Sequence, residues 1–158
     1  MESQEDQKVF YFAYGSNTNA TRMRERCSNF DKRESAKLNN YSFQLNKVRK
    51  KCGTAAANIK PCPGSQVYGA LYTCNECVLK ILDVYEGVKT DQYYRDKVNV
   101  ELEDGSTVEA VTYIAHPHRC KEDLKVKEEY IEHCLGGKDL YPEDYIKFLE
   151  SHRSRVIP

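Results

Sequence analysis

The chain has 158 residues, with 24 Lys and Arg against 24 Asp and Glu, so its formal net charge at pH 7 is zero. This length fits a single domain, residues 1–158, that can bury a sizeable core. Hydrophobic residues make up 40% and charged residues 30%, which excludes a disordered chain, and the charge balance argues against a protein that coats nucleic acid or an anionic membrane.

The N-terminal residues 1–7 are polar and acidic, and we expect them to form a short flexible lead. They lack the basic and apolar regions of an export signal, and no run in the chain approaches the about 18 apolar residues of a membrane helix. The sequence therefore predicts a cytoplasmic protein without membrane contact. Its seven cysteines are then expected to be reduced thiols.

The first predicted elements are a strand and a helix joined by a tight corner. Residues 9–14 (VFYFAY) are β-branched and aromatic and stop at Gly15, which predicts a buried strand that ends in a turn. Residues 19–27 are good helix formers behind a possible N-cap at Thr18 or Asn19, so a short helix is expected there.

The next part of the chain is predicted to be mostly strand. Alternating apolar residues predict a strand over 35–48, and the basic run 47–51 (KVRKK) is expected to start an exposed, solvated loop. Two further strands are expected at 53–59 and 67–72, separated by a turn at 61–65 (PCPGS). Alanines at the centre of the first of these would let another backbone approach closely.

The second half of the chain combines a hairpin with helices. Apolar spacing predicts helices over 75–85 and 122–135 and a last helix opened by Pro142 and running to about residue 151. Residues 93–102 and 108–115 are expected to pair as a hairpin. Together these elements predict an α+β fold with a mixed, mostly antiparallel sheet and flanking short helices, and the sheet can curl into a small β-barrel.

The corner Tyr14–Gly15–Ser16–Asn17 is the first candidate site. Backbone N–H groups at such a strand-to-helix corner point outward and can bind a carboxylate or a developing oxyanion. Gly, Ser and Asn also favour turns in general, and this plain structural reading is the commoner one on physical grounds alone.

Glu86 is the second candidate, because it lies at the end of the helix predicted over 75–85, just before a terminating Gly87. A carboxylate there faces the negative end of the helix dipole, and residues that break a local rule are often functional. Apolar surroundings would raise its pKa towards a value useful for a general base. The alternative is an ordinary exposed Glu at a helix end.

A metal or redox site is a weaker candidate. Cys74 and Cys77 form one CxxC, and His116, His118 and Cys120 add further possible ligands. A second CxxC at regular spacing is missing, and the flanking elements are not those of a thioredoxin, so buried ordinary thiols are favoured.

Several motifs together, in their order along the chain, resemble those of one known family. They are 11–17 (YFAYGSN), 58–65 (NIKPCPGS), 67–72 (VYGALY), 82–88 (LDVYEGV), Tyr93, Tyr130, 135–137 (LGG) and 140–142 (LYP). From about residue 8 to 152 the chain resembles the γ-glutamylcyclotransferase family. The sequence FAYGSN is more similar to the branch that acts on general γ-glutamyl amino acids than to the glutathione-specific branch.

The resemblance implies a small mixed fold with a β-barrel core, and an enzyme that releases 5-oxoproline from a γ-glutamyl amino acid or peptide without a cofactor or metal. Glu86 would be the general acid/base, the loop Tyr14–Gly15–Ser16–Asn17 would hold the γ-glutamyl group, and Tyr93 and Tyr130 would line the pocket. It also suggests a homodimer whose only other partner is the small-molecule substrate.

Two other functions stay open at this point. The same residues would serve a cyclotransferase that acts on γ-glutamylamines or another γ-glutamyl conjugate. A non-catalytic small-molecule-binding module on the same fold is the second, although a binding pocket alone has no need of an acid at position 86. A zinc-stabilised structural protein is a more distant third.

Overall fold

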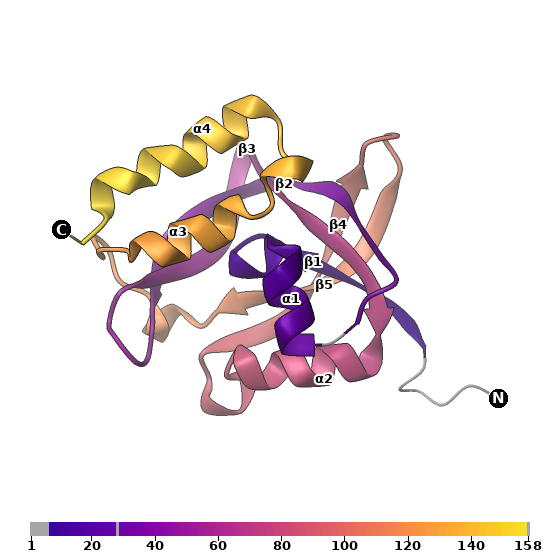
Figure 1. Ribbon diagram of the computed structural model, residues 1–158, viewed down its shortest axis with the longest axis horizontal. Coiled ribbons are helices and arrows are strands. Elements are labelled where there is room, and N and C mark those ends of the chain that lie inside the picture. The colour runs from indigo at the N-terminus through magenta and orange to yellow at the C-terminus, as the bar shows by residue number, and fades with distance from the viewer. Residues whose placement is uncertain (1–6, 28, 158) are drawn as a thin grey trace.

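The computed structural model describes residues 7–27 and 29–157, and within them five strands close into a barrel in the order β1-β3-β2-β4-β5 (Figure 1). The strands are β1 (Lys8–Ala13), β2 (Lys32–Val48), β3 (Ala55–Asn75), β4 (Tyr93–Leu102) and β5 (Thr107–Ala115). All neighbours pair antiparallel except β1 and β5, which meet in parallel at Tyr11 and Val111. The predicted α+β fold with a mostly antiparallel sheet closed into a small barrel is confirmed.

Short helices cover the barrel in two pairs. They are α1 (Ala20–Cys27), α2 (Glu76–Tyr85), α3 (Glu128–Leu135) and α4 (Glu143–Glu150). Figure 1 shows α3 and α4 side by side along one edge of the barrel, with α1 next to α2 in the lower half of the view. None of the helices in the described part of the chain is long and apolar enough to cross a membrane.

The side chains of strand β1 point alternately into two hydrophobic cores. Phe12 is fully buried in the barrel interior, where Leu71 and Val100 also lie. Its neighbour Tyr11 points to the other face and packs in a second cluster with Met23 of α1 and Leu79 of α2, among others. Because successive side chains of a strand face opposite sides, one strand anchors both the barrel and the helices α1 and α2.

The prediction of two strands separated by a turn at 61–65 is wrong, because β3 runs without a break from Ala55 to Asn75. The turn-forming residues instead make a bulge: the pairing with β2 jumps from Asn39↔Gln66 to Tyr41↔Pro61. Gly64 has a φ of +86° there, and its N–H donates to Asn40 Oδ1 at 3.0 Å. Turn chemistry in a long strand thus produces a local irregularity while the ladder continues on both sides.

Two helix boundaries also differ from the prediction. The helix expected over 122–135 begins only at Glu128. Residues 122 and 123 form a bend, with Asp123 at φ +60°, and the fully buried Val126 forms a β-bridge with Val156, its N–H donating to the Arg155 carbonyl at 3.0 Å. The last helix begins at Glu143, so Pro142 precedes it as the N-cap residue and does not occupy its first turn.

The N-terminal lead falls almost entirely outside the described residues, so the expectation for residues 1–6 is not addressed. Residue 7 belongs to the fold, since the Gln7 carbonyl accepts a hydrogen bond from the Glu76 amide at 3.3 Å. The sequence offered Thr18 or Asn19 as the N-cap of the first helix. The structure shows Asn19 in this role for α1, because its Oδ1 accepts the Arg22 N–H at 3.1 Å.

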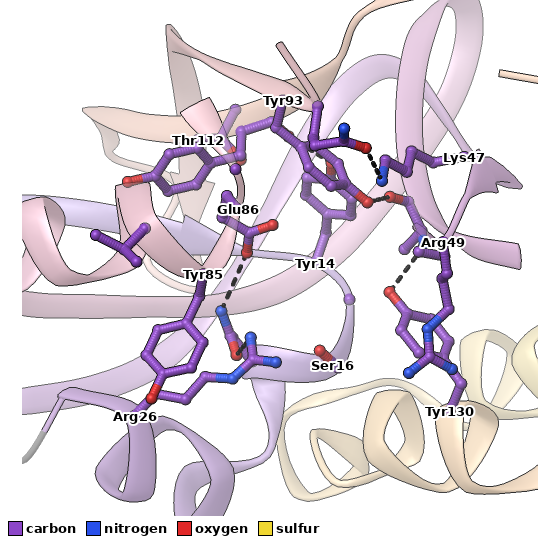
Figure 2. Close-up of a pocket in the computed structure, with 18 of the residues that line it drawn as sticks. Tyr14, Ser16, Arg26, Lys47, Arg49, Tyr85, Glu86, Tyr93, Thr112 and Tyr130 are labelled. Carbon is purple, nitrogen blue, oxygen red and sulfur yellow. Dashed lines mark hydrogen bonds between the residues drawn. The ribbon is translucent and has the colours of Figure 1, made fainter. Parts of the chain in front are cut away.

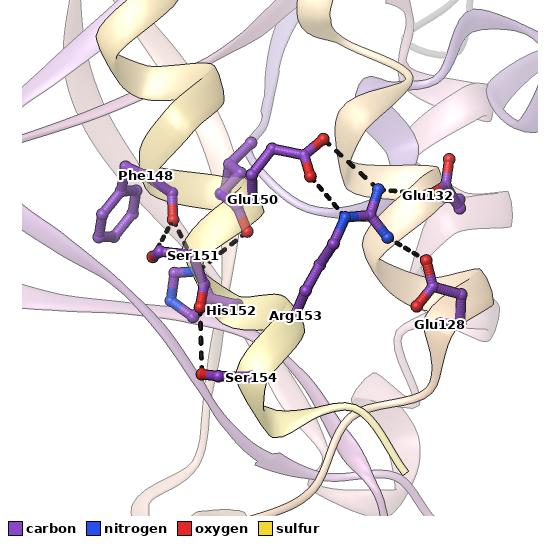
Figure 3. Close-up of polar contacts among 9 residues, drawn as sticks. Glu128, Glu132, Phe148, Glu150, Ser151, His152, Arg153 and Ser154 are labelled. Carbon is purple, nitrogen blue, oxygen red and sulfur yellow. Dashed lines mark hydrogen bonds and ion pairs between the residues drawn. The ribbon is translucent and has the colours of Figure 1, made fainter. Parts of the chain in front are cut away.

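An arginine near the C-terminus ties the helices α3 and α4 together. Figure 3 shows Arg153 between Glu128 and Glu132 of α3 and Glu150 of α4, with Nη2 2.6 Å from Glu132 Oε1. Each contact is partly exposed and weak by itself, but three carboxylates around one guanidinium make a network. This network links the helix that carries Tyr130 to the end of α4.

Candidate active site

A cavity of about 460 Å³ opens between the end of β1, the helices α1 and α2, the end of β2 and helix α3. Figure 2 shows it from inside, with side chains from all of these elements converging on its centre. The structure brings every residue named from the sequence to its wall: Tyr14, Gly15, Ser16, Asn17, Glu86, Tyr93 and Tyr130. Residues far apart in the sequence therefore share one site.

The corner after β1 is held tightly against β3. A Cβ on Gly15 would lie 2.9 Å from the Cβ of Ala57, so the close approach needs a glycine on one side and a small residue on the other. The Gly15 carbonyl accepts the Thr18 amide at 3.2 Å. No described residue accepts a hydrogen bond from the amides of Gly15, Ser16 or Asn17. The corner thus offers unpartnered N–H donors, as an anion-binding corner requires.

The side chain of Asn17 links this corner to Glu86. Its Nδ2 lies 3.4 Å from Glu86 Oε1 and donates to the Tyr11 hydroxyl at 3.1 Å. Its Oδ1 accepts a hydrogen bond from Arg26 at 3.1 Å. The sequence singled out Asn17 for its backbone, whereas the structure also gives its amide side chain a place beside the carboxylate.

Glu86 is placed by the way α2 ends. It is the C-cap residue, with its N–H bonded to the Leu82 carbonyl at 2.8 Å, and Gly87 follows in the left-handed region at φ +63°. The predicted helix end is confirmed, and it turns the half-buried carboxylate into the cavity (Figure 2).

The surroundings of Glu86 are more cationic than the sequence suggested. Burial raises the pKa of Glu86, and the positive charges of Arg26, Lys47 and Arg22 partly oppose this rise, so that the pKa is about 6. The pKa of Glu86 is therefore raised by removal of its carboxylate from water, although charged and polar side chains as well as apolar ones surround it. The carboxyl group can release and accept protons near neutral pH.

The three tyrosines play different parts in the wall. The Tyr14 hydroxyl donates to the Tyr113 carbonyl, and the Tyr93 hydroxyl donates to the Ala57 carbonyl at 2.7 Å. The Tyr130 hydroxyl instead accepts the Ala57 N–H at 2.8 Å, so its own proton remains available to a bound molecule. Burial raises the pKa of all three phenols, which keeps them neutral donors.

The expectation that residues 47–51 form an exposed, solvated loop is wrong for Lys47. This lysine is the penultimate residue of β2, is only 5% exposed, and donates to Gln92 Oε1 at 2.7 Å inside the cavity. The signal was present in the sequence: alternation places residue 47 on the same face as the buried Phe43 and Leu45. The other cationic side chains that the sequence analysis did not assign to the site are Arg22, Arg26, Arg49, Lys50 and Lys51.

The cysteine and histidine cluster gives no metal-binding arrangement in the part of the chain that the structure describes. Cys74 is buried beneath α2, Cys77 is half-buried, and no cysteine is in a disulfide. Burial raises the pKa of Cys74 to about 12, which leaves it a protonated, unreactive thiol.

The sequence motifs agree with a known family over most of the chain. The family described as "Gamma-glutamyl cyclotransferase, AIG2-like" matches residues 11–132. The chain belongs to this family. The resemblance seen in the sequence is thereby confirmed, and the matched region includes every residue of the candidate site.

Relatives of this γ-glutamyl cyclotransferase family member cover nearly its whole length. The chain is 27% identical to a "Gamma-glutamylcyclotransferase" from Bos taurus over 96% of this chain and 82% of that protein. It is also 27% identical to the protein of the same name from Mus musculus, over 94% and 80%. A solved structure titled "Gamma-glutamyl cyclotransferase" superposes with a TM-score of 0.83 at 24% identity, covering 92% of this chain and 88% of the other, which shows the shared fold.

Proposed function

We propose that this member of the γ-glutamyl cyclotransferase family converts a γ-glutamyl amino acid or peptide into 5-oxoproline and the free amine, with Glu86 as the general acid/base. The observation that carries the proposal is a half-buried carboxyl group whose pKa is about 6, inside a cavity that also holds three unpartnered backbone amides. We also propose that it works in the cytoplasm as one catalytic domain, residues 1–158, and as a homodimer.

The chemistry needs one proton carrier and one site for developing negative charge. The substrate's α-ammonium must lose a proton before its nitrogen can attack the γ-carbonyl carbon, and the ionised Glu86 accepts that proton. As the new C–N bond forms, the carbonyl oxygen becomes an oxyanion, which the free amides of Gly15, Ser16 and Asn17 are suited to bind.

The leaving amine departs when its C–N bond breaks and protonated Glu86 returns the proton to its nitrogen. In all, the attacking nitrogen loses two protons and the leaving nitrogen gains two, so no acid or base is consumed. The cavity contributes by holding the flexible glutamyl chain in the folded geometry that a five-membered ring requires.

The proposal predicts that the purified protein produces 5-oxoproline from γ-glutamyl-alanine. Mass spectrometry should detect 5-oxoproline and free alanine in equal amounts. A set of γ-glutamyl peptides and γ-glutamylamines compared by kcat/KM identifies the preferred leaving group. If the folded protein binds these conjugates but converts none of them, the non-catalytic binding module replaces the enzyme.

The pH dependence should report the ionisation of Glu86. Because the reaction begins with the carboxylate form, kcat/KM should rise with pH through a midpoint of about 6, and activity should be lost as pH falls below it. Arg26 lowers this pKa, so Arg26→Gln should move the midpoint upward. A midpoint near the ordinary glutamate value, or one that Arg26→Gln leaves in place, would contradict the assignment.

A further inference from the structure

The cavity carries far more positive charge than one γ-glutamyl group can use. Six cationic side chains line it, and Glu86 is the single carboxylate among the described lining residues. A γ-glutamyl group brings one carboxylate together with its own ammonium. Most of the positive charge therefore has no counterpart in the glutamyl half of the substrate.

Lys47 is the most strongly buried of these cations. It is 5% exposed, and its one hydrogen bond goes to the neutral Gln92 side chain, although an ammonium has three donors. Its Nζ lies 5.4 Å from the centre of the Tyr93 ring. Burial lowers the pKa of Lys47, and the charge of Glu86 opposes this with a smaller upward effect. Glu86 is a counter-charge that Lys47 shares with Arg26 and Arg22. A buried ammonium is costly unless it is fully paired, so a second negative group in the cavity would stabilise it.

Arg49 lies on the same side of the cavity and is also incompletely partnered. Its guanidinium is 5.3 Å from the centre of the Tyr130 ring, and its Nη1 is buried without a hydrogen bond. Glu129 Oε1, at 4.0 Å, is too distant to accept one. Two cationic groups with unused hydrogen-bond donors thus lie at one wall of the cavity.

The position of this wall suggests which part of the substrate it binds. Figure 2 shows Lys47, Arg49 and Tyr130 together on one side of the cavity, with Glu86 between them and the Arg26–Tyr85 side. The amides of the Gly15–Asn17 corner form a separate site for negative charge. A γ-glutamyl amino acid has two carboxylates, one on the glutamyl half and one on the leaving half.

We propose that Lys47 and Arg49 are specificity-determining residues that bind the carboxylate of the leaving amino acid, so that the enzyme selects γ-glutamyl amino acids over γ-glutamylamines. This inference rests on the proposed function. It adds to that function a subsite for the leaving group, built by two residues that lie where β2 ends.

The test compares two substrates that differ by this carboxylate alone. Alanine without its carboxylate is ethylamine, so γ-glutamyl-alanine and γ-glutamyl-ethylamide form a matched pair. The wild-type protein should prefer γ-glutamyl-alanine by about 10- to 100-fold in kcat/KM, the size expected of charge-assisted hydrogen bonds. In Lys47→Met and in Arg49→Gln this ratio should fall towards one, and Arg49→Lys should restore part of it.

Two controls separate specificity from folding and from the proposed reaction. Lys60 is exposed on β3 away from the cavity, so Lys60→Met should keep the wild-type ratio, and melting temperatures show that each variant is folded. Equal use of both substrates by the wild type, or equal losses on both in the variants, would overturn the inference while 5-oxoproline still forms. No 5-oxoproline from either substrate would instead overturn the proposed function, and this inference with it.

Discussion

Replacing Glu86 with glutamine should lower kcat/KM by about 10²- to 10⁴-fold while the protein stays folded, because general acid/base catalysis contributes a factor of this size. The amide keeps the shape of the side chain and can still pair with Asn17, which lies 3.4 Å from Glu86 Oε1. It cannot take the proton from the substrate ammonium. The loss should therefore appear in the rate of 5-oxoproline formation at saturating substrate as well as at low substrate.

The same variant should be more stable than the wild type above pH 6. Burial raises the pKa of Glu86 from 4.5 to about 6, so the folded protein holds the proton more tightly than the unfolded chain does. This favours folding below pH 4.5, and the advantage is lost as pH rises through 6. At pH 8 the ionised carboxylate costs about 2 kcal/mol relative to a neutral group, which Glu86→Gln avoids.

A matched carboxylate outside the cavity provides the control. Glu25 is exposed on α1 and does not line the pocket, so Glu25→Gln should leave both the rate and the pH dependence of stability unchanged. Chemical denaturation of the three proteins at pH 4.5 and pH 8 measures the difference. A folded Glu86→Gln protein with full activity would overturn the catalytic assignment.

The sequence was sufficient for the fold wherever local chemistry and tertiary structure agree. The apolar run of β1 and the glycine that ends α2 act within a few residues, and both were predicted. Local signals failed where distant partners decide the conformation. Val126 is extended because it bonds to Arg155 and Ile157, about 30 residues away, and the turn residues 62–65 only bulge because β2 pairs with β3 on both sides of them.

The residues of the site also differ in whether local sequence or distant contacts determine their place. Glu86 and the Tyr14–Asn17 corner could be recognised because each breaks a local rule or matches a motif. Apart from Lys47, which the alternation of β2 places on a buried face, the cations have no such local signal, because a charged side chain is usually solvated and its burial depends on the closed barrel. Lys47 enters the cavity only because β2 continues to residue 48 and brings its inward face to Gln92 and Tyr93.

Gly69→Ala should be among the most destabilising single substitutions in this chain. A Cβ at position 69 would lie 2.2 Å from the Ala13 carbonyl oxygen and 2.8 Å from the Phe12 ring. Because the first of these atoms belongs to the backbone of β1, no rotation of a side chain can relieve the contact. We expect a loss of about 3 kcal/mol in the free energy of unfolding, at the upper end for overpacking, and a fall of about 6–12 °C in Tm.

The substitution should also reduce activity below Tm, because Ala13 directly precedes the corner that carries the free amides. A shift of about 1 Å in these groups can cost 10²-fold in rate. Gly105→Ala is the matched control, because Gly105 has a φ of +86° but open space around it. This substitution tests backbone strain alone and should lower the free energy of unfolding by about 1 kcal/mol. Calorimetry of both variants measures the loss of stability, and kcat/KM measures the effect on the site. If Gly69→Ala loses no more stability than Gly105→Ala and keeps its kcat/KM, then β1 can move away from β3 without disturbing the corner. In that case the close packing of these two strands does not position the site.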